Sequence, residues 1–519
     1  MRKITGSGPI PATLMCIGEA PGEVEERFGQ VFVGPSGAEL DHLFEHAGIA
    51  RSSVRIRNVL EFHPPSNRDP HPEEIARALP GVWAEIRRVR PKVIMPIGRF
   101  ATHVFLPGRS MDYVQGLVFE NPWGFAVFPV FHPAHALRKP SIFVPLYEAF
   151  AKLKDVLEGR VRPWRAAVPG QYHAMTNKDR LESPELALDT ERTGASTWGL
   201  TWSSVPGQGV AVAAANRQGL TKVLAYIDRA ETIYLHESLG DLETLAAMGL
   251  RVPHEKVVDT LILAFNLGLT AGEEQREGAG RLDRRSLGLK LLGFRLAGME
   301  MRGFMEVMEP LDAEAMRAWL DRQITRRTDR KVARAIANAI LQENPRKALA
   351  RSKFTRDLDP LPMVIPWCGE MIEYAGMDAD ATRRIGPVLR AQIKEAGLEK
   401  IAALDHGVIP LVLHMQRHGL LVDTGQLQII QHEMLDAERA IESRVGDQAW
   451  EGFNPRSHEQ VGHLLFDQLN LPPVKWSKKT RAPSTDGKAL AQLTHTLVDD
   501  LMDLRELRKL RSTYVEALL

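Results

Sequence analysis

The first 160 residues alternate short apolar runs with segments of helical periodicity, and this alternation constrains the fold more than any other feature. The apolar runs predict β-strands at residues 14–17, 54–59, 93–97 and 125–131, and the spacing between them predicts helices at 37–47 and 72–90. Such alternation is typical of a parallel sheet with helices on both faces, so we expect a three-layer α/β/α domain. Glu19, Asn58 and His132 stand at the ends of three of these strands. Ligands of open α/β sheets bind at the carboxyl ends of strands, so the sequence predicts a small-molecule pocket there.

The composition indicates a protein with several domains. At 519 residues the chain is too long for one core, and its length predicts about three to four domains. The 66 basic and 65 acidic residues nearly cancel, so a polyanion partner requires local basic surfaces. Cys16 and Cys368 form no disulfide framework, and we expect both to be buried thiols. Without a signal sequence or a run of transmembrane length, we expect a cytoplasmic protein with no membrane contact.

Three motifs in residues 1–160 carry a family resemblance. The first is Gly18-Glu-Ala-Pro-Gly22 with Glu25-Glu26 and Gly29-Gln-Val-Phe-Val-Gly34, the second is Asn58-Val59 with Pro64-Pro65-Ser-Asn-Arg-Asp-Pro70, and the third is His132-Pro-Ala-His-Ala-Leu-Arg138. In this order they resemble the motifs of the uracil-DNA glycosylase superfamily, in its thermophile-type "family four" branch. The resemblance implies that this segment recognises or excises uracil in DNA.

The resemblance also implies roles for individual residues. Phe32 is expected to stack on a flipped-out uracil, Asn58 to read its polar edge, and His132 to donate to the carbonyl oxygen that gains charge. Glu19 and Glu25 are expected to place water or to stabilise the cationic sugar. Arg138 and Lys139 are expected to wedge the duplex and hold phosphates. The alternative is a retained fold that senses uracil without excising it.

Two departures from that family are visible. Thermophilic members hold an iron–sulfur cluster through four cysteines, whereas His63 stands here where one cysteine is expected, and Cys16 lies inside a strand. We therefore expect no iron–sulfur cluster. Val31 also replaces the usual proline before Phe32.

A second pattern begins at residues 186–194, where an apolar run carries Asp189 and Glu191 before Thr193-Gly194. Alternate residues of a strand point the same way, so both carboxylates leave one face. Neighbouring carboxylates repel unless a cation lies between them, and a divalent metal with oxygen ligands is the usual solution. The alternative is a solvated strand end. Much later, Tyr374 and Asp378 are spaced to share one helical face.

These residues, with Asp241, resemble in order the 3′–5′ exonuclease domain of family A DNA polymerases, which has an RNase H-like fold. The resemblance implies that Asp189, Glu191, Asp241 and Asp378 bind two Mg²⁺ or Mn²⁺ ions, and that Tyr374 orients the attacking water. Two metal ions stabilise both the attacking and the leaving oxygens of phosphodiester hydrolysis.

The middle segment departs from that family in two ways. The second motif reads His236-Glu237 where the family has His-Asn, so the added carboxylate either perturbs metal binding or faces solvent. Residues 322–356 are rich in Arg and Lys, and form either a solvated helical face or a surface that tracks phosphates. We also expect residues 257–265 to be helical throughout.

The last segment has helical spacing, with a long amphipathic helix at residues 427–445. Phe453-Asn-Pro-Arg-Ser457, Ser484-Thr-Asp486 and the basic helix at 505–514 resemble the thumb of family A polymerases, which holds the primer–template duplex. The residues expected to contact DNA phosphates here are Lys475, Lys478, Lys479, Arg508 and Arg511. Nothing resembling a palm or fingers follows, so we expect no polymerase active site in this chain.

The sequence therefore predicts a multidomain α/β protein that acts on DNA. The expected parts are a glycosylase-like domain at 1–160, a linker at 161–180, an exonuclease domain at 181–397 and a helical thumb-like region at 398–519. We expect a proofreading 3′–5′ exonuclease that acts on single-stranded 3′ ends and holds primer–template duplex, with an attached uracil-recognising or uracil-excising domain. The alternative is a non-cleaving, uracil-sensing subunit that docks a separate polypeptide carrying palm and fingers.

Overall fold

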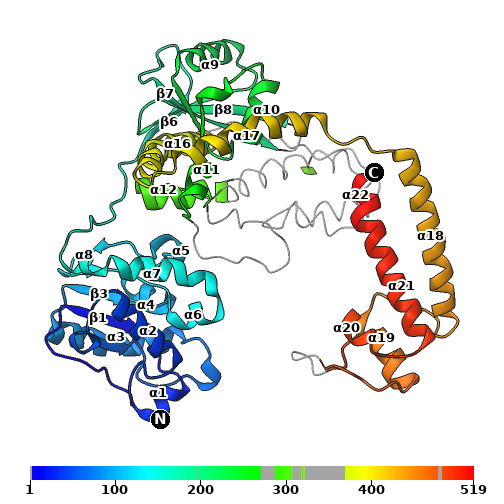
Figure 1. Ribbon diagram of the computed structural model, residues 1–519, viewed down its shortest axis with the longest axis horizontal. Coiled ribbons are helices and arrows are strands. Elements are labelled where there is room, and N and C mark those ends of the chain that lie inside the picture. Colours follow the sequence, from blue (N-terminus) through cyan, green and yellow to red (C-terminus); the bar gives the residue numbers. More distant parts are fainter. Residues whose placement is uncertain are drawn as a thin grey trace. The chain divides into compact units, whose positions relative to one another are not determined.

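The computed structural model describes residues 3–193, 196–269, 287–303, 306–307, 317, 320–321, 369–476 and 482–519. The chain forms two compact units, Met1–His414 and Met415–Leu519. The predicted multidomain α/β architecture is confirmed, because the first unit contains a five-stranded and a six-stranded sheet, each packed with helices (Figure 1).

The five-stranded sheet lies in the first 130 residues and has the order β2-β1-β3-β5-β4. Its strands are β1 (Leu14–Gly18), β2 (Arg55–Asn58), β3 (Val93–Pro96), β4 (Phe119–Glu120) and β5 (Ala126–Val127). All pairings are parallel except that of β4 with β5. The predicted strand at 125–131 is shortened to β5, although the Phe128 and Val130 amides still donate to β3 carbonyls. Pro96 and Pro129 have no N–H to donate, so the regular ladder stops early.

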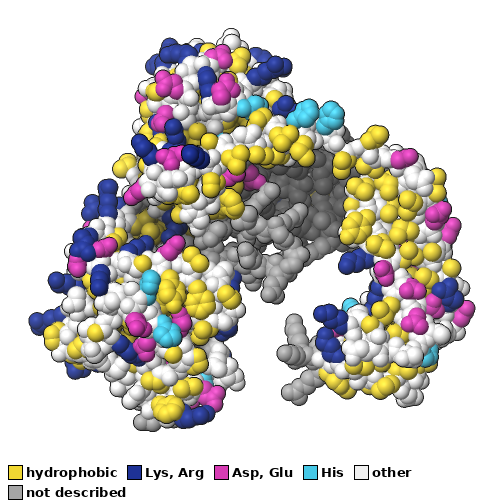
Figure 2. Space-filling view, viewed as in Figure 1, with side chains coloured by type: hydrophobic (Ala, Val, Ile, Leu, Met, Phe, Trp, Pro, Cys, Tyr) yellow, Lys and Arg dark blue, Asp and Glu magenta, His cyan; other side chains and the backbone are white. Residues whose placement is uncertain are grey.

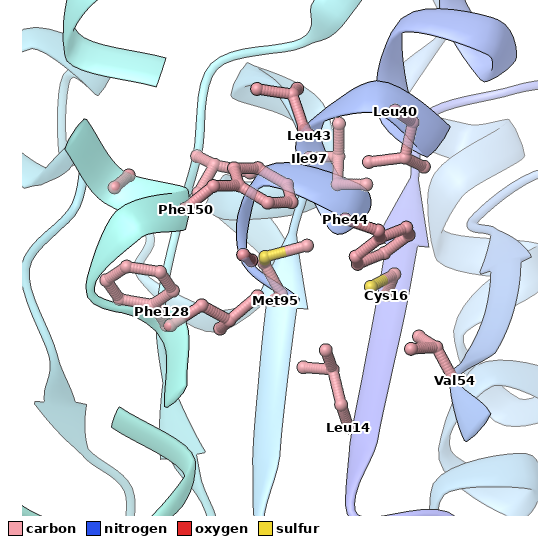
Figure 3. Packing of buried hydrophobic residues seen from close by; sticks show 14 of the residues in the cluster. Leu14, Cys16, Leu40, Leu43, Phe44, Val54, Met95, Ile97, Phe128 and Phe150 are labelled. Atoms are coloured by element: carbon pink, nitrogen blue, oxygen red, sulfur yellow. The ribbon is translucent and has the colours of Figure 1, made fainter. Parts of the chain in front are cut away.

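Helices cover both faces of this sheet. They are α1 (Glu23–Phe28), α2 (Pro35–His46), α3 (Pro72–Val89), α4 (Arg99–Phe105), α5 (Met111–Val114), α6 (Pro133–Arg138), α7 (Phe143–Ala151) and α8 (Leu153–Leu157), with 3₁₀ turns η1 (Arg51–Ser53), η2 (Pro65–Asn67) and η3 (Pro140–Ile142). Side chains of β1 alternate between two cores, because Leu14 and Cys16 pack on one face while Met15 and Ile17 pack on the other. Figure 3 shows Cys16 beside Phe44 and Met95 in the first core. The predicted three-layer arrangement is therefore observed.

The six-stranded sheet is mixed, with the order β11-β10-β7-β8-β9-β6. Its strands are β6 (Gln171–Ala174), β7 (Glu185–Thr193), β8 (Ser196–Ser203), β9 (Gln208–Ala213), β10 (Thr232–Leu235) and β11 (Val257–Asp259). Strands β7, β8 and β9 are antiparallel neighbours, and the remaining pairings are parallel. Strand β6 forms within the segment expected to be a linker, because its backbone pairs with β9 and Tyr172 donates to Asp380 of a distant helix at 3.0 Å.

The expectation of a continuous helix at 257–265 is wrong. Val257 and Val258 are β-branched and pair with β10, and helix α11 (Thr260–Asn266) starts only after Asp259. The Asp259 carboxylate caps α11 by accepting from the Leu261 amide at 2.9 Å.

One core of the second sheet lies under α9 (Arg217–Arg229) and α10 (Ser238–Ala247). The other face contacts α16 (Gly369–Glu395), which in turn packs with α11 and α12 (Leu289–Ala297). The turn η4 (His254–Lys256) precedes β11. Helix α16 therefore spans the sheet and brings residues near 378 to strands near 190.

Helix α17 (Glu399–His418) was expected to belong to the thumb-like region, but most of it belongs to the first unit. Its Ile409 and Leu413 are buried in the core of the second sheet, which places the unit boundary after His414 rather than at residue 398. The opposite side of α17 leaves Ile401, Leu404 and Leu411 exposed, and Figure 2 shows hydrophobic side chains along this helix.

The second unit is helical. It contains α18 (Thr424–Gly446), α19 (His458–Gly462), α20 (Gly487–Leu490), α21 (Thr496–Leu510) and α22 (Glu516–Leu518), with π-helical turns η7 (His463–Gln468) and η8 (Arg511–Val515). Helices α18 and α21 pack along each other, and Val445, Leu465 and Leu497 belong to a small core between these elements. The predicted amphipathic helix at 427–445 is confirmed, with three more residues at its start.

Candidate functional site

A cavity of about 880 Å³ opens at the carboxyl edge of the first sheet. All seven residues predicted to contact uracil or nearby DNA line it: Glu19, Glu25, Phe32, Asn58, His132, Arg138 and Lys139. Gly18 ends β1 directly beside Asn58 at the end of β2, because these two residues are register partners in parallel strands. The predicted convergence of unlike polar groups at this sheet edge is observed.

Phe32 enters the cavity with a backbone conformation that bulky residues rarely adopt, at φ 53°. The Arg51 guanidinium donates to the Phe32 carbonyl at 3.0 Å and the Val31 carbonyl at 3.3 Å, which holds this turn. The Phe32 ring lies over His132, with ring centroids 5.8 Å apart and planes inclined by 23°. A Cβ on Gly18 would lie 2.6 Å from the Phe32 ring, so only glycine leaves room for the ring here.

His132 is the N-cap of α6 and is held as a neutral hydrogen-bond donor. Its Nδ1 accepts from the Ala134 amide at 3.1 Å, which leaves the proton on Nε2. Burial, with smaller effects of Arg138 and His135, lowers the pKa of His132 to about 4. The ring is therefore uncharged at neutral pH and can donate through Nε2.

Burial changes the chemical properties of two further polar groups in the cavity, Asn58 and Glu19. The side-chain oxygen Oδ1 of Asn58 is buried and has no hydrogen-bond partner among the described residues. A buried polar atom without a partner costs free energy, so this amide is suited to a ligand. Burial and the charge of Asp69 raise the pKa of Glu19 to about 7, against the opposing effects of Arg99 and Arg138.

Glu25 is held in the cavity wall by hydrogen bonds from the loop backbone. Its two carboxylate oxygens accept from the backbone amides of Gly22 and Gly34, each at 3.1 Å. These bonds close the loop that carries Phe32 and fix the orientation of the carboxylate in the cavity wall. The expected role of Glu25 toward water or the sugar stays a prediction.

A second site lies where β7 meets α16. One carboxylate oxygen from each of Asp189, Glu191 and Asp378 can lie within 4.8 Å of the other two. Asp189 and Glu191 leave the same face of β7, and Asp378 comes from a helix nearly two hundred residues later. The predicted convergence of these three carboxylates is observed.

Asp241, the fourth predicted carboxylate, stands beside this group but not within it. Its Oδ1 accepts from the Thr190 amide at 3.2 Å and from the Thr190 hydroxyl. The negative charge of Asp241 is, after burial, the largest influence that raises the pKa of Asp189. Asp241 is therefore a neighbour of Asp189 rather than a fourth ligand of the same ion.

Burial and mutual repulsion oppose the simultaneous ionisation of these carboxylates. Burial and the Asp378 charge raise the pKa of Glu191 to about 8, and burial raises the pKa of Asp241 to about 7. Burial also raises the pKa of Asp378, against the effects of Lys290 and of a hydrogen bond from Tyr374. All these shifts favour protons, or an added cation, at the site.

Lys290 completes this site, and no sequence motif predicted a role for it. Its Nζ lies 2.5 Å from Asp378 Oδ1 and 4.1 Å from the centre of the Tyr374 ring. It is the second residue of α12, in an amphipathic stretch with no motif of its own. A lone lysine on an apolar helix beside an acidic motif is the available signal, and it is a weak one.

The second motif places its histidine and its extra carboxylate differently. His236 hydrogen-bonds to the Thr260 hydroxyl at 2.9 Å, and burial lowers the pKa of His236 to about 4. Glu237 has φ 61° and is exposed, and the effect of its carboxylate on metal binding stays a prediction. Asp259 supports this turn by accepting from the Glu237 amide at 3.1 Å and the Ser238 amide at 2.7 Å.

The first segment of the chain matches one known protein family. The family model of the uracil DNA glycosylase superfamily matches residues 5–155. A type-4 uracil-DNA glycosylase of Saccharolobus solfataricus is 37% identical over 166 residues, which cover 30% of this chain and 77% of that protein. The chain belongs to the uracil DNA glycosylase superfamily. A second type-4 enzyme, from Thermotoga maritima, is 37% identical over 140 residues, covering 27% of this chain and 73% of that protein.

This glycosylase superfamily chain also contains a region related to DNA polymerases. The family model of DNA polymerase family A matches residues 424–519. DNA polymerase I of Treponema pallidum is 31% identical over 150 residues, or 28% of this chain, and the match spans only 15% of that polymerase. A solved structure, the "POL domain of Pol1 from M. smegmatis complex with DNA primer-template and dNTP", is 18% identical with a TM-score of 0.40, covering 64% of this chain and 46% of that chain. A score of that size does not establish a shared fold. The predicted fusion of the two families is confirmed by the match of residues 5–155 to the glycosylase superfamily and of residues 424–519 to DNA polymerase family A.

The residues of this superfamily member do not fit an iron–sulfur cluster. The sequence has two cysteines, fewer than the four thiolates that the resemblance requires. Cys16 is buried in β1, and burial raises the pKa of its thiol, which disfavours a thiolate ligand. Cys368 lies outside the described residues. His63 instead hydrogen-bonds to Glu26 at 2.9 Å and Asn67 at 3.0 Å.

The basic residues predicted to bind DNA in the polymerase-related region divide into three groups. Arg508 and Arg511 are largely buried and pair with Glu438, which favours a structural role within the unit over phosphate binding. Lys475 is exposed and pairs with Asp486 at 2.6 Å. Lys478, Lys479 and the basic segment 322–356 lie outside the described residues.

Two other expectations concern surfaces. Leu510, Tyr514, Leu518 and Leu519 are exposed apolar residues, as a docking role would require, and that role stays a prediction. Across the described ranges, none of the helices combines the length and apolar character needed to cross a membrane.

Proposed function

We propose that the first domain hydrolyses the bond between uracil and deoxyribose in DNA. The observation that carries this proposal is the buried, unpartnered Asn58 Oδ1 in a cavity shared with neutral His132. Uracil presents an N–H flanked by two carbonyl oxygens, so the Asn58 amide matches one polar edge by accepting from the N–H and donating to a carbonyl. The similarity to type-4 uracil-DNA glycosylases supports the same activity.

The chemistry follows from three side chains. The target base leaves the stack and lies against the Phe32 ring. His132 Nε2–H donates to the uracil carbonyl oxygen that becomes negative as the C1′–N1 bond breaks and its electron pair moves into the ring. The Glu19 carboxylate orients a water whose oxygen bonds to C1′, and it accepts the proton that this water loses. Arg138 and Lys139, at the cavity rim, hold the flanking phosphates.

The test uses a duplex with one uracil, treated with alkali after incubation so that each excised base gives a strand break. His132→Ala is expected to lower the rate about 100- to 1,000-fold, the usual cost of one lost donor to developing charge. His42→Ala, an exposed histidine on α2, is the matched control and is expected to retain the full rate. Binding of uracil-containing duplex without strand breaks would favour the sensing alternative. Equal rates for His132→Ala and wild type would contradict the proposed mechanism.

We also propose that the second site hydrolyses DNA from its 3′ end. The observation that carries this proposal is the convergence of Asp189, Glu191 and Asp378 with raised pKa values and Asp241 beside them. Oxygen donors of this kind fit Mg²⁺ or Mn²⁺. Asp189, Glu191 and Asp378 would hold one ion, and Asp189 with Asp241 a second.

Two such ions, when bound, supply charge stabilisation at the attacking and leaving oxygens of the phosphodiester. The side chains have separate tasks. Burial and the neighbouring carboxylates raise the pKa of Tyr374, so its hydroxyl stays protonated. Its one proton is donated to Asp378, and its oxygen orients the attacking water by accepting a hydrogen bond from it. The Thr190 hydroxyl and amide fix the orientation of Asp241.

The test is release of nucleotides from a labelled single strand with a free 3′ end in Mg²⁺. Asp189→Asn keeps the side-chain volume and is expected to reduce release to background. Asp436→Asn, an exposed aspartate on α18, is the matched control. Uracil excision by the same preparation reports that the chain is folded. Full nucleotide release by Asp189→Asn would overturn the proposal.

We further propose that residues 424–519 hold primer–template duplex by its backbone. The match to DNA polymerase family A and the exposed Lys475 support this role. Lys475→Ala is expected to reduce the slope of log affinity against log salt by about 1, because one phosphate contact is lost. Arg508→Ala is expected to destabilise the unit instead. An unchanged salt slope for Lys475→Ala would remove this lysine from the interface.

A further inference from the structure

Among the described residues, Lys290 provides the ammonium group nearest to the carboxylates of the second site. Its Nζ lies 2.5 Å from Asp378 Oδ1, and its charge also acts on Asp189 and Glu191. The side chain is 23% exposed, so the ammonium is neither buried in the core nor free in solvent. It therefore occupies a position beside Asp378 that a bound cation would also use.

The charge balance shows what this lysine does. Four ionised carboxylates carry four negative charges, and two divalent ions would cancel them. Lys290 adds one positive charge, which repels incoming metal ions and leaves the loaded site with a net charge that suits one phosphodiester. Without metal, the same ammonium is the cation that reduces repulsion among Asp189, Glu191 and Asp378.

The Tyr374 ring offers the ammonium a second partner. The Nζ lies 4.1 Å from the ring centre, within the range of a cation–π contact. A lysine with two neighbouring partners can leave Asp378 without losing all its stabilising contacts.

We propose that Lys290 is a built-in counter-cation that competes with divalent metal for Asp378 and thereby sets the metal affinity of the site. The inference rests on the proposed exonuclease function, because it concerns the same carboxylates. The direction of the change in metal affinity distinguishes this inference from a purely structural role of Lys290. A lysine that only positioned Asp378 would strengthen metal binding, whereas a competing lysine weakens it.

The packing of α12 around Lys290 allows the role of this lysine to be tested by substitution. Leu289, Leu291 and Leu292 on α12 are buried, so the helix is held by side chains other than Lys290. Methionine at position 290 keeps an unbranched stem beside Tyr374 and removes the charge, and arginine keeps the charge.

The first measurement is Mn²⁺ affinity, by calorimetry or electron paramagnetic resonance, with Asp189→Asn defining binding elsewhere on the protein. Lys290→Met is expected to bind Mn²⁺ about tenfold more tightly than wild type, and Lys290→Arg to bind it with near wild-type affinity. Lys222→Met on α9, a partly exposed lysine that donates to Asn177 at 3.2 Å, is the matched control and should leave the affinity unchanged. Weaker or unchanged binding by Lys290→Met would overturn the proposal.

The second measurement does not depend on metal. In chelator, Lys290→Met is expected to have a lower Tm than Lys222→Met, because three buried carboxylates lose their counter-charge, and saturating Mn²⁺ is expected to remove this difference. An equal Tm for the two variants in chelator would overturn the proposal.

The outcomes separate this inference from the exonuclease proposal. If wild type binds Mn²⁺ but releases no nucleotides, the exonuclease proposal fails and the lysine proposal is decided by the affinity of Lys290→Met. If only Lys290→Met binds Mn²⁺, the lysine proposal stands and Lys290 keeps the natural site closed. If neither protein binds Mn²⁺, both proposals fail.

Discussion

Helix α16 approaches strand β9 at Gly209, and the distances there allow the effect of one methyl group to be worked out. A Cβ placed on Gly209 would lie 2.2 Å from the Gly376 carbonyl oxygen, whereas ordinary van der Waals contact begins at 3.4 Å. Gly209→Ala must therefore push the two backbones apart by about 1 Å, the difference between these distances. Gly376 lies between Tyr374 and Asp378 on α16, so both side chains move with it.

The expected consequence is a selective loss of one activity. A displacement of about 1 Å in a catalytic group costs about 100-fold in rate. We expect Gly209→Ala to lower nucleotide release from 3′ ends about 100-fold and to weaken Mn²⁺ binding, because Asp378 retreats from Asp189 and Glu191. Overpacking of this kind lowers the free energy of unfolding by about 1–3 kcal/mol.

The assay measures nucleotide release and uracil excision in the same preparation. Uracil excision is expected to be unchanged, since its cavity is built from the first sheet. Gly407→Ala is the matched control, because a Cβ there meets nothing within 4 Å, and it is expected to stabilise α17 by up to about 1 kcal/mol. Undiminished nucleotide release by Gly209→Ala would refute the reasoning, and an equal loss of both activities would show general unfolding instead.

Four further predictions follow from charge and backbone geometry. Uracil excision is expected to rise with pH through about 7, where Glu19 with its pKa raised to about 7 loses its proton, and Glu19→Gln should remove this rise in initial rates measured from pH 5.5 to 8.5. Chelation of divalent metal is expected to abolish nucleotide release and spare uracil excision. In chelator, folding raises the pKa of Glu191 from 4.5 to about 8, so its contribution to stability is full below pH 4.5 and is lost as the pH rises through about 8. The Tm of Glu191→Gln should therefore exceed that of wild type increasingly over this range, and saturating Mn²⁺ should cancel the difference. Glu237→Asn is expected to raise the free energy of unfolding in urea by about 1 kcal/mol, because asparagine tolerates φ 61° better than glutamate.

The first site could be predicted almost completely from sequence, for a physical reason. Glu19 directly follows β1, Asn58 ends β2, and His132 follows Val130, whose amide still donates to the β3 carbonyl of Pro96. Parallel strands bring their carboxyl ends to one edge. Local patterns were therefore enough to place them together. The two backbone hydrogen bonds of Glu25 could not be predicted, because they depend on how the loop between Gly22 and Gly34 closes in three dimensions.

For the second site, the sequence predicted only the residues that belong to recognisable motifs. Asp189 and Glu191 share a strand face by simple alternation, and Tyr374 and Asp378 share a helical face. Lys290 contacts Asp378 across 88 positions, and nothing local to α12 indicates this contact. In the second unit, the pairing of Arg508 and Arg511 with Glu438 joins helices about 70 residues apart, so a basic pattern read as a DNA contact is satisfied within the unit.

Burial has different consequences at the two sites, and this difference is the reason that we propose metal ions for only one of them. In the glycosylase cavity, burial produces a neutral donor at His132 and one carboxyl group, Glu19, near its point of ionisation at neutral pH. The charges of Arg99 and Arg138 oppose the rise in the pKa of Glu19. At the second site, burial raises the pKa of Asp189, Glu191 and Asp378 together, while a single ammonium opposes them. Their full ionisation at neutral pH therefore requires further positive charge, and divalent cations would supply it in the form that the proposed phosphodiester hydrolysis uses.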